Sequence, residues 1–382
     1  MCGAATEVVL KILQVAPLWE SVPPRAYGGT EAVVHVLVEE LVRRGHEVTL
    51  CASGDSRTSA RLIAHYPRSL RTADLENKAI YSWQHAALSL KDARHYDIVH
   101  NHAGEEVMAL AHLIPDVPML TTMHCLVTPD TQFIWDRYPG HYNTISRSQY
   151  AEMPQVSGGI YGGVVYNGID VASFPLQTDK DDHLLFLSRI SPEKGPHLAV
   201  EAARLCGKKL IMAGKIDSYD QRFFDTTIAP LIDGDRVVFV GEADATKKRE
   251  LYKNAACVLM PLTWEEPFGL VLAEAQACGT PVIAFNRGAA AEIVTDGITG
   301  FVVDTVEQMA GAVLRLNEID PLACRRHVED HFDGCSMADG YLHLYQSIIE
   351  GQPVGRPGGG TNGHAPLLGE RLAEGAQTAL AA

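Results

Sequence analysis

Two carboxylates, Glu266 and Glu274, stand eight positions apart around the run PFGLVLA, which leads into EAQACGTPV. The pattern predicts a polar loop followed by a buried helix, with Glu266 facing a cavity and Glu274 about two helical turns deeper. A carboxylate accepts two hydrogen bonds from a vicinal diol, and charged acceptors make the stronger bonds. The pair therefore suits a ligand that carries a sugar and a ribose. The alternative is a capped core helix with one exposed acid, because Glu is common at helix starts.

Two cations occur in the string LLFLSRISPEKG, where Arg189 ends a predicted strand and Lys194 follows five residues later. A strand end directs the guanidinium into a crevice, and the following turn returns the ammonium to the same place. Two cations together suit a diphosphate. The alternative is that each is a solvated surface charge.

Paired glycines, Gly28 and Gly29, close the first predicted strand-to-helix loop, and Thr30 and Glu31 open the helix. Glycines let the backbone approach a ligand, and the N–H groups and positive dipole end of a helix suit a phosphate. A tight turn explains the same pair equally well. The pattern GxGxxG is absent, which argues against ordinary nicotinamide dinucleotide binding.

His124, in the string TTMHCLVT, ends an apolar run and is predicted to face the cleft opposite Glu266, where it bonds a donor hydroxyl or the acceptor. A lone histidine at a strand end is more often structural. That structural interpretation is also the one we give to His100 and His102 in DIVHNH.

No metal site is predicted. The one DxD string, Asp233-Gly234-Asp235, precedes a strand and is typical of a tight turn, and His100 and His102 have no third ligand at a recognisable spacing. Arg189 and Lys194 are left to neutralise phosphates together with the glycine loop. Neither a GxSxG elbow nor a P-loop occurs, so covalent catalysis by Ser or Cys is not expected.

These residues must be positioned by an alternation of short apolar runs and helical patterns, which predicts parallel βαβ units. The expected domains are 1–170, with the glycine loop, and 171–334, joined by a hinge near residue 170, followed by a closing helix at 335–350 and a flexible tail at 351–382. In open parallel sheets the ligand crevice lies beyond the carboxyl ends of the strands. The predicted strands are 8–16, 47–52, 96–101, 118–124 and 141–146 in the first half, and 184–188, 210–213, 237–240, 257–260 and 281–284 in the second.

The composition limits the kinds of molecule that the protein is expected to bind. A chain of 382 residues with 46% hydrophobic residues can fill two cores, and a net charge of -15 disfavours nucleic acid and anionic lipid as main partners. The 8 cysteines are scattered without a CxxC pair, which predicts reduced thiols in a cytoplasmic protein. No segment has the apolar length of a membrane span, and loose contact with a membrane surface stays open.

The ordered strings resemble glycosyltransferase family 4, the retaining nucleotide-sugar transferases with the GT-B fold. The resemblance covers nearly the whole chain. It rests on GGTE, TMH, VVYNGID, RISPEKG, GEADATKKRELYKNAACVLMPL, EEPFGLVLAEAQACGTPVIAF and DGITGFVVD, in that order. It implies an α/β architecture with two Rossmann-like, doubly wound domains facing across a cleft.

The resemblance also implies roles for single residues. Gly28 and Gly29 would approach the β-phosphate, and Arg189 and Lys194 would hold the diphosphate. Glu266 would bind the transferred sugar, Glu274 would take the ribose diol, and His124 would lie near the far hydroxyl of the sugar. Further donor contacts would come from the backbone of Phe268, Gly269 and Leu270 and of the loop that starts at Gly241.

The acceptor is expected on the first domain, as a small molecule or a glycan. Tyr27, Phe133 and Trp135, and also Trp19, are predicted to stack on a ring, with a packed loop as the alternative. The chain departs from the family pattern after Phe285: it has Arg287-Gly288-Ala289-Ala290-Ala291-Glu292 where members commonly carry a Gly-Gly pair. This puts the pose of the sugar in question.

The implied reaction is metal-independent transfer of a sugar from a nucleoside diphosphate sugar, with UDP-glucose as the default donor, to an acceptor hydroxyl. No cofactor is expected. Alternatives are a sugar-nucleotide epimerase or a glucan synthase of the same fold, and a non-catalytic module that binds a nucleotide sugar.

Overall fold

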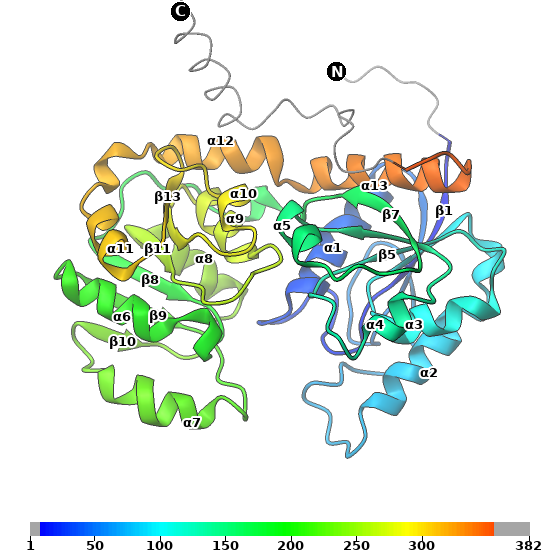
Figure 1. Cartoon of the computed structure of the whole chain (residues 1–382), viewed down its shortest axis with the longest axis horizontal. Helices are drawn as coiled ribbons and strands as arrows, with labels where there is room; N and C mark the ends of the chain where they lie inside the picture. Colours follow the sequence, from blue (N-terminus) through cyan, green and yellow to red (C-terminus); the bar gives the residue numbers. More distant parts are fainter. Residues whose placement is uncertain (1–7, 355–382) are drawn as a thin grey trace, which may run out of the picture.

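The computed structural model describes residues 8–354 and divides them between two α/β domains (Figure 1). The predicted tail at 351–382 lies, beyond residue 354, outside the described residues. Within 8–354, every predicted strand occurs with ends shifted by a few residues, because short apolar runs buried on both faces are the mark of central parallel strands.

The N-terminal domain contains a seven-stranded sheet in the order β3-β2-β1-β4-β5-β6-β7, with parallel pairing throughout. Its strands are β1 Lys11–Val15, β2 Glu47–Cys51, β3 Arg61–Ile63, β4 Ile98–Asn101, β5 Met119–Thr122, β6 His141–Thr144 and β7 Ile160–Val164. Its helices are α1 Gly29–Arg43, α2 Ala79–Ser89, α3 Glu105–Leu110, α4 Gln132–Trp135 and α5 Arg147–Glu152.

The C-terminal domain repeats the architecture with a six-stranded parallel sheet in the order β10-β9-β8-β11-β12-β13. Its strands are β8 His183–Leu187, β9 Lys209–Ala213, β10 Val237–Phe239, β11 Cys257–Met260, β12 Val282–Phe285 and β13 Gly300–Val303. Its helices are α6 Pro196–Leu205, α7 Gln221–Phe223, α8 Ala245–Asn254, α9 Leu270–Ala277, α10 Ala290–Ile293, α11 Val306–Val313 and α12 Pro321–His331. Both strand orders are doubly wound, which confirms the predicted fold class.

Three strands were not predicted: β3, β7 and β13. All three lie at sheet edges, where strands are short and one flank is open. Strand β7 carries two glycines in IYGGV and none of its residues is fully buried, so it lacks the apolar pattern of a central strand.

The chain passes between the domains twice, at two segments that lie side by side. Ile169 donates its N–H to the carbonyl of Phe332 at 2.9 Å, and Gly334 donates to the carbonyl of Ile169 at 3.1 Å. The second passage leads into α13 Gly334–Ile349, which packs against α1 and the N-terminal core through residues such as Tyr341 and Tyr345. Helices α12 and α13 therefore run along one side of both domains (Figure 1).

Candidate active site

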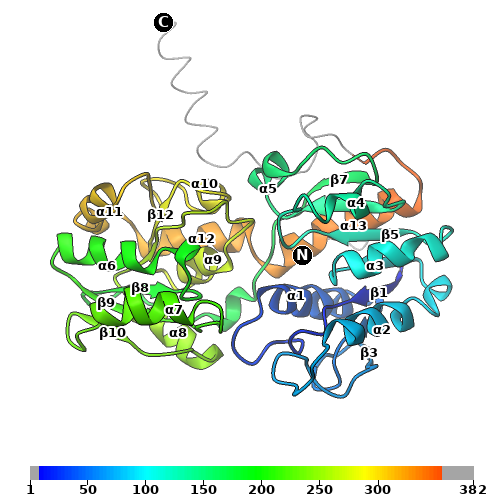
Figure 2. The same cartoon turned by 60° about the horizontal axis from the view of Figure 1, so that its bottom comes forward.

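The carboxyl ends of strands from both sheets supply the loops between the domains. Arg189 follows β8, Gly241 follows β10, and Glu266 follows β11. From the other domain α1 approaches: a Cβ placed on Gly29 would lie 3.4 Å from Leu270 Cδ1 at the start of α9. Figure 2 shows α1 at the edge of its domain that faces the other lobe. Two helix N-termini thus meet at the cleft, an arrangement that favours an anion.

The guanidinium of Arg189 already has acidic and hydroxyl partners. Its Nη2 donates to Glu193 Oε1 at 2.7 Å, and its Nη1 donates to the Tyr219 hydroxyl at 3.0 Å and lies 3.7 Å from the Asp217 carboxylate. Lys215 pairs with the same Asp217 at 2.8 Å. The buried Nε of Arg189 has no hydrogen-bond partner among residues 8–354. An incoming polyanion would therefore replace these acids around the two cations.

Lys194 and Glu266, predicted for the diphosphate and for the sugar, form an ion pair with each other. Their side chains are only 10% and 14% exposed. The indole of Trp264 donates to the same carboxylate oxygen of Glu266 at 3.1 Å, and Lys194 Nζ lies 4.5 Å from the centre of the Trp264 ring system. Glu266 is thereby held in one orientation at the cleft.

Glu274 lies on the buried face of α9 and is 6% exposed. One carboxylate oxygen accepts from Lys248 Nζ at 2.6 Å and the other from the Tyr252 hydroxyl at 2.8 Å, both from α8. Burial, together with the neighbouring carboxylate, raises the pKa of Tyr252 well above its ordinary value, so Tyr252 stays a donor. A ribose diol would use the lone pairs that these two bonds leave on Glu274.

The glycine loop is held by a buried carboxyl. Gly28 has a left-handed φ of 152°, and a Cβ there would lie 2.7 Å from Pro24 Cβ, so only glycine fits without rearrangement. Glu31, in the first turn of α1 and 5% exposed, accepts from the N–H of Glu20 at 3.2 Å. Burial raises the pKa of Glu31 to about 7.

His124 is half-buried after β5, and its Nε2 lies 2.9 Å from Nδ1 of His102. Burial lowers the pKa of His124 to about 4, and lowers those of His100 and His102 well below the ordinary value. All three imidazoles are therefore neutral at neutral pH. His100 and His102 are buried, as their structural interpretation requires, but His102 also contacts the candidate site residue.

The next residue, Cys125, shows which surface this turn faces. Burial raises the pKa of its thiol, Glu266 adds to that shift, and Lys194 and Arg189 oppose it. These three groups belong to the other domain. The turn that carries His124 and Cys125 therefore faces the loops of the C-terminal domain.

Tyr27 lies between two cations. Lys215 Nζ is 4.3 Å from its ring centre and Arg71 Cζ is 5.1 Å away, so the ring bridges the domains through cation–π contacts. Partial burial raises the pKa of Tyr27, while Arg189 opposes the shift and Glu266 adds to it. Tyr27 thus lies at the cleft next to Arg189 and Lys215, and its side chain is 42% exposed.

The other predicted acceptor contacts do not gather with Tyr27. The stacking role predicted for Trp135 is wrong, because its indole is 3% exposed, packs edge-on against Tyr142 and donates to Glu105 Oε1 at 3.2 Å. Phe133 is 63% exposed, but Arg137 covers its ring at 3.9 Å. Residues two apart in a helical turn point in opposite directions, so one of the two had to face the core.

The backbone positions near Glu266 are set by close packing. Phe268 is 2% exposed and packs against Phe332, so only its backbone can reach a ligand, and Gly269 caps α9 with a left-handed φ of 84°. Gly288 lies against the Glu266 backbone, where a Cβ would come within 2.2 Å of its N and O atoms. Position 288 therefore requires a glycine, because the backbones of Gly288 and Glu266 pack directly against each other.

Two further loop positions complete this part of the site. The neighbouring Ala289 is fully buried and donates to the carbonyl of Glu266 at 2.8 Å, so the alanine is accommodated where family members commonly have glycine. The carbonyl of Gly241 accepts from the N–H of Gly214 at 3.0 Å, which joins the loops after β9 and β10.

Glu292 makes a contact that the sequence did not predict. Its carboxylate accepts from the N–H groups of Arg147 and Ser148 at 2.9 and 2.7 Å, and from the Tyr166 hydroxyl at 2.7 Å. Arg147 and Ser148 begin α5 of the N-terminal domain, whereas Glu292 lies in α10. Lys248 and Tyr252 were also missed, although their i,i+4 spacing places both on one helix face.

Among residues 8–354, no group of three or more His, Cys, Asp or Glu side chains is arranged to hold a metal ion. The DxD string forms a turn, in which Asp233 Oδ1 accepts from the N–H groups of residues 235, 236 and 237 at 2.8 to 2.9 Å. In the same part of the chain, no helix combines the length and the apolarity needed to cross a membrane.

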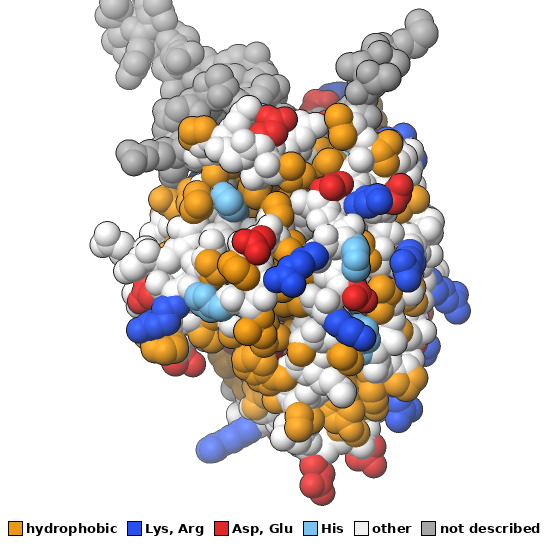
Figure 3. Space-filling view, turned by 90° about the vertical axis from the view of Figure 1, so that its right-hand side faces the viewer, with side chains coloured by type: hydrophobic (Ala, Val, Ile, Leu, Met, Phe, Trp, Pro, Cys, Tyr) orange, Lys and Arg blue, Asp and Glu red, His pale blue; other side chains and the backbone are white. Residues whose placement is uncertain are grey.

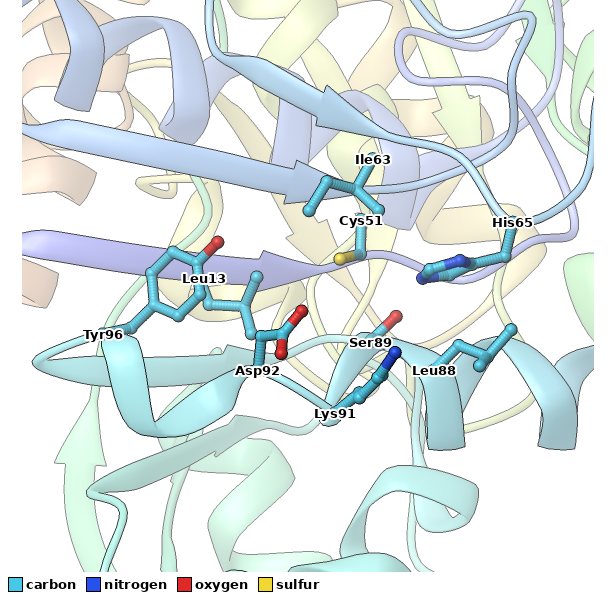
Figure 4. A pocket seen from close by; sticks show the side chains of 9 residues that line it. All are labelled: Leu13, Cys51, Ile63, His65, Leu88, Ser89, Lys91, Asp92 and Tyr96. Carbon is cyan, nitrogen blue, oxygen red and sulfur yellow. The ribbon is translucent and has the colours of Figure 1, made fainter.

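A separate cavity of about 260 Å³ lies in the N-terminal domain between strands β1 to β3 and the end of α2 (Figure 4). Cys51 and Leu13 form its strand side, and Ser89, Lys91 and Asp92 form its helix side. It contains none of the predicted site residues.

The outer end of the same domain carries an apolar area. Figure 3 shows apolar side chains gathered in the lower half of this face, with basic and acidic side chains above them and along the lower edge. Ile80, Trp83 and Leu88 are the exposed large apolar residues of α2. Charges of both signs occur on this face, so charge alone does not favour an anionic surface as its partner.

Comparisons with known proteins agree with this arrangement. A family model described as "Glycosyl transferases group 1" matches residues 170–326, and one described as "Glycosyltransferase Family 4" matches residues 27–173. The two matches meet where the chain first passes between the domains. The glycogen synthase of Mycobacterium tuberculosis is 27% identical, over 91% of this chain and 97% of that protein.

Solved structures show the same fold. AviGT4, a glycosyltransferase involved in avilamycin A biosynthesis, superposes with a TM-score of 0.72 and 26% identity, over 90% of this chain and 98% of that one. HepE of Anabaena, solved in complex with UDP and glucose, gives a TM-score of 0.68 and 20% identity, over 88% of this chain and all of that one.

Proposed function

The chain belongs to the GT-B glycosyltransferases of the family 4 type, and from this premise we propose that it moves a sugar from a nucleoside diphosphate sugar to an acceptor hydroxyl with retention of configuration. UDP-glucose is the donor we propose, which is supported by the UDP and glucose bound to HepE. The acceptor would be a small molecule or a glycan. A cytoplasmic location is part of the proposal, supported by the absence of disulfides among the described cysteines.

One observation carries the proposal: the cations Arg189 and Lys194 and the N-termini of α1 and α9 converge on the cleft together with Glu266. The leaving diphosphate gains charge as the glycosidic bond breaks. Cations and amide N–H groups directed at it therefore stabilise the transition state more than the bound donor. These groups would do so without a metal ion.

The state of Glu266 supports front-face displacement, in which the leaving phosphate accepts the proton of the acceptor. Its carboxylate is held by Lys194 and Trp264 through one oxygen, Oε2, and pairing with the Lys194 cation makes the carboxylate a weaker nucleophile. Glu266 is better placed to accept a hydrogen bond from a sugar hydroxyl. His124 cannot act as a general acid near neutral pH, because its pKa is lowered to about 4.

The test is consumption of donor by the purified chain. A thermal-shift screen against UDP, GDP and ADP sugars identifies the donor, since a ligand that binds the folded state raises its melting temperature. Arg189→Ala should then lower turnover at saturating donor by at least about 100-fold, as expected when a transition-state contact is removed. Arg315→Ala is the matched control, because Arg315 is an exposed surface residue whose ion pair is with Glu318.

Two results would count against the proposal. Wild-type turnover by Arg189→Ala at saturating donor would show that the diphosphate is held elsewhere. Tight binding of a nucleotide sugar with no release of nucleoside diphosphate, even over long incubation, would favour the binding-module alternative.

A further inference from the structure

A continuous path of buried hydrogen bonds leads from a backbone carbonyl in β6 to the ring of His124. It crosses four neighbouring strands of the N-terminal sheet and includes one residue from α13. Each link is 2.6 to 3.2 Å long. The path runs through Thr144, Asn143, Thr122, His100, Tyr345, Gln14, His102 and His124.

The first hydrogen bond of the path determines which atom donates and which accepts in each of the bonds that follow. Asn143 Nδ2 donates to the carbonyl oxygen of Thr144 at 3.2 Å, and a carbonyl can only accept. The amide of Asn143 therefore cannot be turned over, and its Oδ1 faces Thr122 Oγ1 at 2.8 Å. Since Oδ1 accepts, the hydroxyl proton of Thr122 is used on this bond.

His100 must then donate to Thr122. The distance between His100 Nε2 and Thr122 Oγ1 is 2.6 Å, and Thr122 has no second proton to give. Burial keeps His100 neutral, since its pKa lies well below the ordinary value, so His100 Nδ1 carries no proton. It accepts from the Tyr345 hydroxyl at 2.6 Å.

The same logic continues through Gln14. The proton of Tyr345 is used on His100, so Tyr345 accepts from Gln14 Nε2 at 3.0 Å. The other end of that amide, Oε1, then accepts from His102 Nε2 at 2.8 Å. His102 is likewise neutral because burial lowers its pKa, and its Nδ1 is left as an acceptor.

The last hydrogen bond of the path determines the tautomer of His124. His102 Nδ1 accepts at 2.9 Å, so the proton of His124 is on Nε2. Its Nδ1 carries a lone pair and has no hydrogen-bond partner among residues 8–354, and the turn that carries it faces the C-terminal domain. We propose that this path holds His124 as the Nε2–H tautomer and presents Nδ1 to the cleft as an acceptor for one hydroxyl of the bound substrate.

The proposal assigns positioning roles to Gln14, His102 and Tyr345, and it rests on the proposed function for the nature of the ligand. A neutral acceptor favours a sugar that offers an O–H at this position. It disfavours a deoxy analogue and a carboxylate there, because neither offers a proton and the lone pair would be left unpaired.

Tyr345 and Tyr341 form a matched pair for the test. Both are buried in α13, and each would lose one hydroxyl on change to Phe. Tyr341 donates to Thr122 Oγ1 at 3.1 Å but lies off the path, whose direction Asn143 sets. Tyr345→Phe breaks the path between Gln14 and His100, and Tyr341→Phe leaves it intact.

The first measurement needs no substrate. Long-range proton–nitrogen NMR spectra of the full chain labelled with ¹⁵N-histidine distinguish the tautomers, and His124→Gln identifies the His124 signals. We expect a single Nε2–H tautomer in the wild type and in Tyr341→Phe, and a mixture in Tyr345→Phe. An Nδ1–H tautomer in the wild type, or an unchanged Nε2–H tautomer in Tyr345→Phe, overturns the proposal.

The second measurement is kcat/KM with UDP-glucose and its deoxy analogues. Tyr345→Phe should lose about tenfold with UDP-glucose, as for one hydrogen bond, and Tyr341→Phe should lose less than about twofold. With the one deoxy donor that lacks the contacted hydroxyl, the wild type and Tyr345→Phe should have the same kcat/KM. If Tyr345→Phe instead loses the same factor in kcat/KM on every donor, His124 does not contact a donor hydroxyl in the way we propose. If the wild-type protein turns over no donor, the proposed function is wrong. The NMR measurement still tests the tautomer of His124 in that case.

Discussion

The carboxylate of Glu292 accepts a hydrogen bond of 2.7 Å from the N–H of Ser148, so a side chain of one domain binds the backbone of the other. The two residues are 144 positions apart. With the bonds from Arg147 and Tyr166, this carboxylate is fixed at three points beside the passages between the domains. It therefore helps to hold the two domains in their relative position.

Glu292→Ala should loosen that arrangement. We expect kcat/KM for the donor to fall about tenfold, since charge-assisted hydrogen bonds of this kind contribute about 1.5–3 kcal/mol. Small-angle scattering should show a larger radius of gyration in the absence of nucleotide. Glu318→Ala, which removes an exposed partner of Arg315, serves as the control. Unchanged scattering and kinetics in Glu292→Ala would show that the domains are held by other contacts.

Removal of Lys194 should separate stability from catalysis. Lys194→Met leaves the Glu266 carboxylate without its cation, and we expect the free energy of unfolding to fall by about 3 kcal/mol. Turnover should fall at least about 100-fold. Adding Glu266→Gln should recover most of the stability, because no unpaired charge remains, but no turnover. Urea denaturation and donor consumption measure the two effects.

The surface pair of Lys208 and Asp182 is the control for this experiment. Asp182 is 85% exposed, and exposed pairs contribute little. Lys208→Met should change stability by less than about 1 kcal/mol and leave turnover unchanged. A double variant of Lys194 and Glu266 that is as unstable as Lys194→Met would show that the pair is not coupled.

Glu31 predicts a pH dependence of stability. Burial raises its pKa from the ordinary value of 4.5 to about 7, so the folded protein keeps a proton that the unfolded chain releases above pH 4.5. The stabilisation is complete below pH 4.5 and is lost as the pH rises through 7. Glu31→Gln removes this loss, so its stability relative to wild type should increase by roughly 3 kcal/mol between pH 4 and pH 8.5.

Urea denaturation at several pH values measures that difference. Glu250→Gln, an exposed acid on α8, is the control and should follow the wild-type curve. A constant difference between Glu31→Gln and wild type across the range would mean that Glu31 is ionised in the folded protein.

Tyr252→Phe tests the support of Glu274. The variant leaves one carboxylate oxygen with its bond to Lys248 and frees the other. If Glu274 binds the ribose, as the family resemblance implies, we expect weaker binding of the nucleoside diphosphate by about three- to tenfold, with kcat at saturating donor nearly unchanged. Calorimetric titration with UDP measures the affinity. Tyr96→Phe, in the separate cavity, should bind UDP like wild type.

Substitution of the two adjacent glycines, Gly28 and Gly29, by alanine should have different effects. Gly28→Ala places a methyl group 2.7 Å from Pro24 at a left-handed φ, whereas Gly29→Ala places one at an ordinary contact distance of 3.4 Å from Leu270. Gly28→Ala should lower the melting temperature by several degrees, as for about 1–2 kcal/mol. Gly29→Ala should fold normally and bind UDP more weakly, since the methyl group occupies the cleft. The reverse order of melting temperatures would contradict the loop geometry.

Much of the fold follows from local pattern. The strands β8 and β11 are predicted because an apolar run bounded by polar residues can bury both faces only inside a parallel sheet. The positions of Arg189 and Lys194 follow as well, since they are set by the end of one strand and the turn after it. Strand β7 could not be predicted, because an edge strand with two glycines has no apolar pattern to read.

The order of residues along the chain is enough to show which of them stand at strand ends and helix starts, and hence the fold class and most of the polar groups of the candidate site. Their partners depend on the folded arrangement: Lys194 pairs with Glu266, which is 72 positions away, Glu274 bonds to Tyr252 on another helix, and the Trp135 side chain is buried in the core. Local pattern depends on neighbours a few residues away, whereas pairing and burial depend on how distant segments pack together.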